Sequence, residues 1–83
     1  MIYSAVNAEV ERARFKFPCP DLLVTAFTEE FGEAIKAILD YRAGKGGITA
    51  VRTELIQTMA MCVRLLEEGD PIHNLPPSDF TGN

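Results

Sequence analysis

The sequence predicts an all-α fold in which three helices form a single domain. The chain has 83 residues, which is enough for one domain and no more. Three groups of helix-breaking residues divide it: Pro18-Cys19-Pro20, Gly44-Lys45-Gly46-Gly47 and Gly69-Asp70-Pro71. Between these groups, apolar residues recur every three or four positions, which is the spacing of amphipathic helices. We therefore expect three helices, followed by an extended C-terminal tail over residues 70–83.

The first two helices follow directly from this spacing. The first is expected over about Ile2 to Arg14, with apolar positions at Ile2, Val6, Val10 and Ala13. The second is expected to run from an N-cap at about Asp21 to Ala43. Its core-facing residues are expected to be Leu23, Phe27, Ala34, Ile38 and Tyr41.

The third helix is expected to run from an N-cap at about Thr49 to Glu68, after a hairpin turn at residues 44–47. Its apolar side chains cover one broad face and spread over much of the remainder. A helix that is apolar nearly all round is normally buried, and two other helices in so short a chain can hardly cover it. We therefore expect the second and third helices to form an antiparallel pair that completes a four-helix bundle in a homodimer or homotetramer. The alternative is that the chain is a monomer, because scattered exposed apolar residues are common on the surfaces of monomers.

The composition limits the classes of partner. The chain carries 8 Lys and Arg residues against 12 Asp and Glu residues, which gives a net charge of −4. This balance argues against duplex nucleic acid as the main ligand, because such binding depends on basic residues that neutralise phosphates. No apolar run approaches the roughly 18 residues of a membrane span, and the N-terminal residues lack the pattern of a signal peptide. We therefore expect a cytoplasmic protein with no membrane partner.

Two glutamates interrupt the apolar side of the second helix. On a helical wheel Glu30 falls within the apolar arc, and Glu33 lies at the edge of that arc. Carboxylates three residues apart on a helix repel each other. Burying such a pair is costly unless one carboxylate takes up a proton or a divalent cation binds both. The neighbouring Glu29 points outward on the same wheel.

The third helix carries a matching pair, Glu54 and Gln57, at the same spacing. If the two helices are antiparallel, the two pairs surround one point and offer three anionic oxygen ligands and one neutral one. Such hard ligands suit Mg²⁺ or Mn²⁺. The alternative is structural: Glu30 reaches solvent or pairs with Arg52 or Arg64, and glutamates at this spacing occur by chance in many helices.

These residues resemble a known signature. Thr28-Glu29-Glu30-Phe31-Gly32-Glu33-Ala34, followed later by Glu54-Leu55-Ile56-Gln57, is similar to the EExxE…ExxD motif of the MazG-like all-α nucleoside triphosphate pyrophosphohydrolases. The resemblance covers about residues 22–66, roughly half of the chain. The run from Glu54 to Met61 is similar to a small phage and bacterial subgroup in which Gln occupies the final motif position.

The resemblance implies hydrolysis of a nucleoside triphosphate to the monophosphate and pyrophosphate. It would make Glu30, Glu33 and Glu54 ligands of Mg²⁺, with Gln57 as a further ligand. Glu29 would serve as a ligand or, with Glu30, as a catalytic residue that orients the attacking water. The chemistry is reasonable, because metal ions neutralise phosphate oxygens and a carboxylate accepts the proton of the water.

Gln57 departs from the motif, because an amide offers a carbonyl oxygen but no charge and cannot act as a base. Two alternatives to an active enzyme therefore stay open. One is a catalytically silent protein that binds a nucleotide or a metal. The other is a purely structural helical oligomerisation protein whose carboxylates form ordinary salt bridges.

Two groups of basic residues are candidates for binding the substrate. We select Lys36, Arg52 and Arg64 for the phosphates, although Lys36 has an alternative partner in Asp40, four residues further along. The second group is Arg12, Arg14 and Lys16, which alternate with Phe15 and Phe17. This second segment either stacks a base and binds its phosphates, or leaves its helix with the aromatic rings packed on the core.

Overall fold

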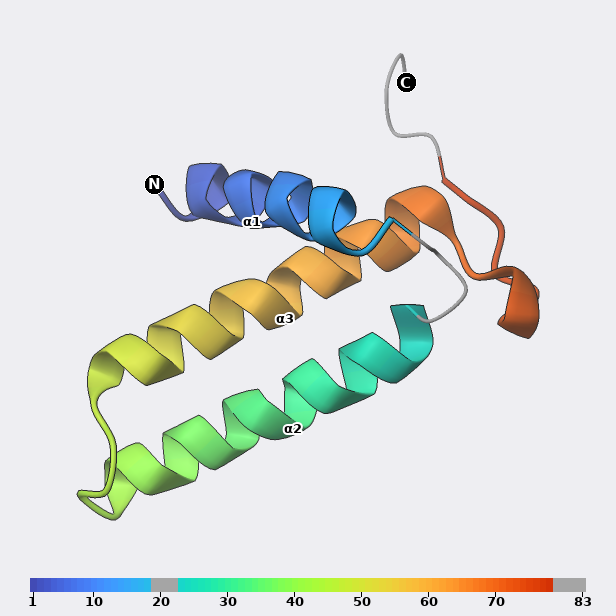
Figure 1. The fold of residues 1–83 in the computed structure, drawn as a ribbon. Coiled ribbons are helices and arrows are strands. Elements are labelled where there is room, and N and C mark those ends of the chain that lie inside the picture. Colours follow the sequence, from blue (N-terminus) through green and yellow to red (C-terminus); the bar gives the residue numbers. More distant parts are fainter. Residues whose placement is uncertain (19–22, 79–83) are drawn as a thin grey trace.

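The structure is a computed structural model that describes residues 1–18 and 23–78. It contains three α-helices, α1 (Ile2–Lys16), α2 (Leu23–Arg42) and α3 (Ile48–Glu68), followed by a short 3-10 helix, η2 (Pro71–His73). The predicted all-α fold is therefore confirmed. Helix α3 lies between the other two helices and packs against both, and α2 runs antiparallel to it (Figure 1). In the described part of the chain, no helix is long and apolar enough to cross a membrane.

The helix ends differ from the prediction by one or two residues. Helix α1 continues to Lys16, because the restriction that Pro18 imposes acts only on Phe17. Helix α3 begins at Ile48 with Gly47 as its N-cap, so the expected N-cap at Thr49 is wrong. Helix α2 ends at Arg42, and its predicted N-cap, Asp21, lies outside the described residues.

The predicted hairpin turn joins α2 to α3 and has the hydrogen bonds of a Schellman motif. The backbone N–H of Lys45 donates to the carbonyl of Asp40 at 2.7 Å, and that of Gly44 donates to the carbonyl of Tyr41 at 3.1 Å. Gly44 has a φ of 75°, a left-handed conformation that favours glycine. The turn makes α2 and α3 antiparallel neighbours and so sets which residues of the two helices face each other.

A small apolar core holds α1 against α3. Val6 and Val10 of α1 pack against Ala60 of α3, and the partly buried Ile56 and Val63 border them. Ala13 is buried one turn further along α1. These are the predicted apolar positions of α1 except Ile2, which is exposed.

An ionic network joins the C-terminal ends of the same two helices. The buried guanidinium of Arg64 donates to Glu68 at 2.8 and 3.0 Å and to the backbone carbonyl of Ala13 at 3.4 Å. Arg14 of α1 donates to the same Glu68 carboxylate at 2.8 Å and also contacts Glu67. These two arginines lower the pKa of Glu68, with the hydrogen bond from Arg64 as the largest cause. The network therefore fixes the end of α1 near the end of α3.

The residues after α3 fold back, so the predicted extended tail is wrong over residues 70–78. The buried Asp70 accepts a hydrogen bond from the N–H of Ile72 at 2.9 Å, which caps η2. The backbones of Asp70 and Leu75 pair with each other, and the N–H of Ser78 donates to the carbonyl of Leu66 at 2.9 Å. Gly69 permits this return, because a Cβ there would collide with the carbonyl of Leu75. Residues 79–83 lie outside the described part.

One face of the α2–α3 pair carries large apolar side chains that are 39–53% exposed. We call it the apolar face; it consists of Phe31, Ile35, Ile38, Ile48, Leu55, Met59 and Leu66. On the helical wheel its α3 residues lie on the opposite side of the helix from Gln57. The predicted core stripe of α2 is therefore wrong at Ile38, which belongs to this face, and at Tyr41, which is exposed near the C-terminal end of α2.

Candidate functional site

Three glutamate side chains converge between α2 and α3. Glu30 and Glu33 are one turn apart on α2, and Glu54 faces them from α3; one carboxylate oxygen of each lies within 4.8 Å of the others. Thr58 fixes the register beside them, because its hydroxyl lies 2.8 Å from the carbonyl oxygen of Glu54 and 3.2 Å from that of Glu30. We call these three carboxylates the glutamate cluster.

The side chain of Gln57 completes this arrangement. With its NH₂ group turned toward the cluster, it donates hydrogen bonds to Glu54 at 3.1 Å and to Glu30 at 3.2 Å. With the amide reversed, its carbonyl oxygen faces the same two carboxylates. The first orientation satisfies the carboxylates without a cation, whereas the second offers a fourth oxygen ligand to one.

The glutamate cluster concentrates negative charge. Partial burial and the neighbouring charges of Glu33 and Glu54 raise the pKa of Glu30 to about 7. Partial burial, followed by the charge of Glu33, also raises the pKa of Glu54. Among residues 1–18 and 23–78, no Lys, Arg or His forms an ion pair with these three carboxylates. The structural alternative, in which Glu30 pairs with Arg52 or Arg64, is therefore not what the structure shows.

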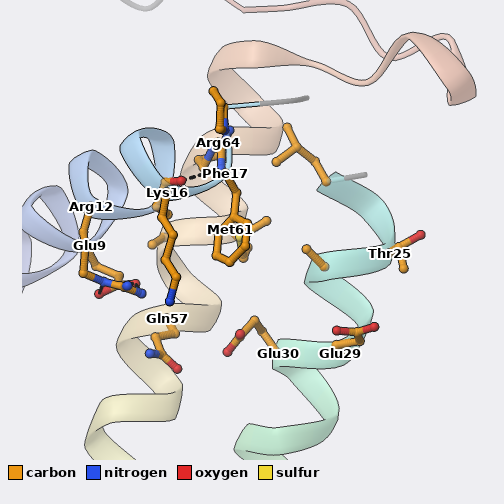
Figure 2. A pocket seen from close by; sticks show the side chains of 15 residues that line it. Glu9, Arg12, Lys16, Phe17, Thr25, Glu29, Glu30, Gln57, Met61 and Arg64 are labelled. Atoms are coloured by element: carbon orange, nitrogen blue, oxygen red, sulfur yellow. Dashed lines mark hydrogen bonds and ion pairs between the residues drawn. The ribbon is translucent and has the colours of Figure 1, made fainter. Parts of the chain in front are cut away.

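A pocket of about 460 Å³ opens beside the glutamate cluster. It lies between the C-terminal end of α1 and the N-terminal half of α2, with α3 as its base (Figure 2). Glu30 and Gln57 line one end of it, and Phe17 and Met61 lie together at the other. Figure 2 shows the side chain of Lys16 extending from α1 toward Gln57. Glu30 therefore belongs to both the cluster and the pocket wall, whereas Glu33 and Glu54 do not line the pocket.

Of the remaining predicted site residues, Glu29 lines the pocket, whereas Lys36 and Arg52 do not. Glu29 lines the edge of the pocket and is exposed, but it is not one of the three converging carboxylates. Lys36 is exposed and pairs with Asp40 at 2.9 Å, the alternative partner that the sequence offered it. Neither Lys36 nor Arg52 is among the residues that line the pocket.

Arg64 lines the pocket, but its guanidinium is held by Glu68 and Ala13. It is 1% exposed, so its role in the structure is to join α1 to α3. The selection of Arg64 as a phosphate ligand is therefore not supported by the hydrogen bonds that it makes.

Besides Arg64, the basic side chains that the structure brings to the pocket wall are Arg12 and Lys16, both from α1. The alternation of basic and aromatic residues in this segment indicated them, together with Phe17. The same pattern did not distinguish Phe15, which is 92% exposed, or Arg14, which pairs with Glu67 and Glu68. Met61 had no signal of its own, because many residues of α3 are apolar and tertiary packing selects the one that lines the pocket.

Comparison of the chain with models of known protein families, with curated proteins and with solved structures finds no match. The function of the protein is therefore inferred from the residues of this site and from their resemblance to the EExxE…ExxD motif.

Proposed function

We propose that the protein is a Mg²⁺-dependent nucleoside triphosphate pyrophosphohydrolase, which cleaves its substrate to a nucleoside monophosphate and pyrophosphate. One observation carries the proposal: the fold brings Glu30 and Glu33 to within 4.8 Å of Glu54. These are three of the four glutamates of the two motif halves, which are far apart in the sequence; Glu29 is the fourth. Their convergence is what the resembled motif requires.

The side chains of the cluster fit a hard divalent cation. Glu30, Glu33 and Glu54 would hold Mg²⁺ or Mn²⁺ through carboxylate oxygens, and Gln57 would add its carbonyl oxygen. A bound cation would neutralise the oxygens of the substrate phosphates. Because the pKa of Glu30 is raised to about 7, binding of the cation near neutral pH releases a proton from the cluster.

The substrate is expected to meet three further side chains of α1 and α2. We assign Glu29, which is exposed at the pocket edge, to orient the attacking water, with Glu30 as the alternative base. Lys36 remains a candidate for the phosphates, because only a surface ion pair with Asp40 holds it. Its exposed position lies one turn beyond Glu33 on α2. The third is Lys16 of α1, which extends from the pocket wall toward Gln57.

We further propose that two copies of the chain associate through the apolar face. Its residues recur on each helix at spacings of three, four or seven, so they form stripes that an equivalent pair of helices can cover. Large exposed apolar patches are uncommon on monomers and typical of interfaces. A symmetric pair would bury this face in a four-helix bundle and leave both pockets open on the outside.

A second function, nucleotide binding without turnover, is favoured by Gln57. Its NH₂ group can satisfy Glu30 and Glu54 with no cation present, and the missing charge weakens attraction for Mg²⁺. In this second function the substrate would bind and remain intact.

Phosphorus NMR tests the proposed function. The protein is incubated with a panel of ribo- and deoxyribonucleoside triphosphates, with Mg²⁺, with Mn²⁺ or with a chelator. We expect metal-dependent formation of monophosphate and pyrophosphate, a loss of at least about 100-fold in Glu30→Gln and Glu54→Gln, and no change in the control Glu11→Gln on the exposed side of α1.

Three other outcomes are informative. Turnover that persists in Glu30→Gln and Glu54→Gln would contradict the proposed catalytic site. Nucleotide binding without turnover in the natural protein, together with turnover gained in Gln57→Asp, would establish the silent binder. An absence of both binding and turnover would leave only a structural role.

A further inference from the structure

We propose that the pocket end formed by Phe17 and Met61 is the site for the nucleobase, and that the phosphates pass Lys16 to reach the glutamate cluster. The inference rests on the proposed function and specifies which part of the chain recognises the substrate. That part is Lys16 at the end of α1, Phe17 directly after it, and Met61 of α3, all of which lie outside the motif. The reason is the order of side chains along the pocket: Phe17 and Met61 at one end, then the ammonium of Lys16, then the oxygen ligands of Glu30 and Gln57 (Figure 2).

The apolar end of the pocket has the surface that an aromatic ring needs. Phe17 contributes its ring, Met61 its thioether, and Leu23 and Ala60 add further apolar surface. Met61, Leu23 and Ala60 are buried, whereas Phe17 remains 59% exposed. A half-exposed aromatic ring at a pocket is suited to stacking on a nucleobase, which has an aromatic face whatever its identity.

The position of Phe17 follows from how α1 ends. Lys16 is the last helical residue, and Phe17 leaves the helix with a non-helical backbone, with φ of −131° and ψ of 76°. The ring thereby turns toward the pocket instead of continuing around the helix (Figure 2). Phe15, only two residues earlier, is still helical and does not line the pocket. Two phenylalanines with similar sequence surroundings therefore have different environments, which makes them a matched pair for mutation.

The ammonium of Lys16 lies where the anionic middle part of the ligand would bind. The ammonium of Lys16 lies 5.4 Å from the centre of the Phe17 ring and extends toward Gln57 (Figure 2). The neighbouring Arg12 also lines the pocket but is paired with Glu9. A cation between an apolar end and a carboxylate end suits a ligand whose ring is followed by an anionic group. The pocket volume of about 460 Å³ is within the range of sites that bind small organic molecules and exceeds what a cation alone requires.

Binding measurements with two probes test this inference. The probes are a nucleoside triphosphate with a non-hydrolysable α,β bond and inorganic triphosphate, each titrated by calorimetry in the presence of Mg²⁺. We expect Phe17→Ala to weaken binding of the nucleotide about ten-fold or more and to leave binding of inorganic triphosphate within about two-fold. Phe15→Ala should change neither affinity. Phe17→Tyr should retain nucleotide binding, and Lys16→Gln should weaken both probes.

The outcomes separate this inference from the proposed function. If the natural protein binds the nucleotide and Phe17→Ala binds it equally well, the base site assigned here is wrong while the proposed function stands. If the natural protein binds neither probe, the proposed function fails and this inference fails with it. Equal weakening of both probes in Phe17→Ala would also overturn the base site, because it would show a general effect on the pocket.

Discussion

Glu30 is the residue that links the glutamate cluster to the pocket. It lies partly buried between α2 and α3, next to Glu33 on its own helix and opposite Glu54. Partial burial and the two neighbouring carboxylates destabilise the charged form of its carboxyl group and so raise its pKa. A bound cation lowers the pKa of Glu30 again, so the protonation state of Glu30 indicates whether the cluster holds a cation.

The raised pKa of Glu30 predicts a pH-dependent stability. Between about pH 4.5, the ordinary pKa of the carboxyl, and about pH 7, its pKa in the fold, the folded protein holds a proton that the unfolded chain has lost. The contribution of Glu30 to the free energy of unfolding therefore falls as the pH rises through this window. In a chelator, Glu30→Gln should melt at about the same temperature as the natural protein at pH 5 and at a higher temperature at pH 8.

Thermal melting of both proteins at a series of pH values measures this difference. Subtracting the Glu30→Gln curve removes the titration of the groups that do not interact with Glu30, and Mg²⁺ added at pH 8 should raise the melting temperature of the natural protein more than that of Glu30→Gln. A difference that stays constant from pH 5 to pH 8 would mean that the pKa of Glu30 is not raised by the fold.

Helical spacing was sufficient to predict the glutamate cluster, because the wheel placed Glu30 on an apolar side and the hairpin turn forced α2 and α3 to be antiparallel. It was not sufficient for the pocket. Lys16 and Phe17 reach the pocket only because α1 packs on α3, and this depends on contacts across the whole chain. The hydrogen bonds of Arg64 were only partly predictable: Glu68 lies four residues further along the same helix, whereas the contact with the carbonyl of Ala13 depends on how α1 packs on α3.

At the level of whole elements, α1 is attached to the α2–α3 pair by a small core and by Arg64. The core is limited to a few side chains, so the ionic network at the end of α1 carries a large share of this attachment. The fold-back after α3 is a second local element. It could not be predicted from the proline content of the tail, because it depends on the Asp70 side chain as a cap.

Removing Arg64 should loosen α1. Arg64→Met deletes three hydrogen bonds from a buried guanidinium and leaves Glu68 with Arg14 alone, so we expect a loss of about 2–3 kcal/mol in the free energy of unfolding. Arg12→Met is the matched control. Among the described residues Arg12 pairs only with Glu9, on the surface of α1, and its loss should cost less than about 1 kcal/mol. Urea denaturation compares the two variants, and equal losses would contradict the structural role of Arg64.

At the scale of the whole molecule, the two sides of the α2–α3 pair differ in character. One side carries the glutamate cluster and the pocket, which α1 helps to enclose. The other side is the apolar face, which no described element covers. The sequence predicted that the three helices could not bury all the apolar residues of α3, and the exposed Leu55, Met59 and Leu66 agree with this prediction. The identity of the partner that covers them is our proposal.

Charges placed on the apolar face should prevent association. Light scattering of the natural protein is expected to give the mass of a dimer or tetramer, and the double variant Leu55→Glu, Met59→Glu is expected to give the 9.2 kDa monomer. Tyr3→Glu is the control, because Tyr3 is an exposed apolar residue on α1, outside the apolar face. A natural protein that is monomeric at high concentration, or a double variant that keeps its larger mass, would contradict the proposed assembly.

Electron paramagnetic resonance of Mn²⁺ tests most directly whether Glu30, Glu33, Glu54 and Gln57 hold a divalent cation. Titration of the natural protein at pH 8 should deplete the signal of free Mn²⁺ in a saturable way, and Mg²⁺ should restore that signal by competition. Glu54→Gln should weaken the binding about ten-fold or more, whereas Glu11→Gln should not change it. Free Mn²⁺ that is undiminished by the natural protein, with and without a non-hydrolysable nucleotide, would contradict the metal site and the hydrolase that depends on it.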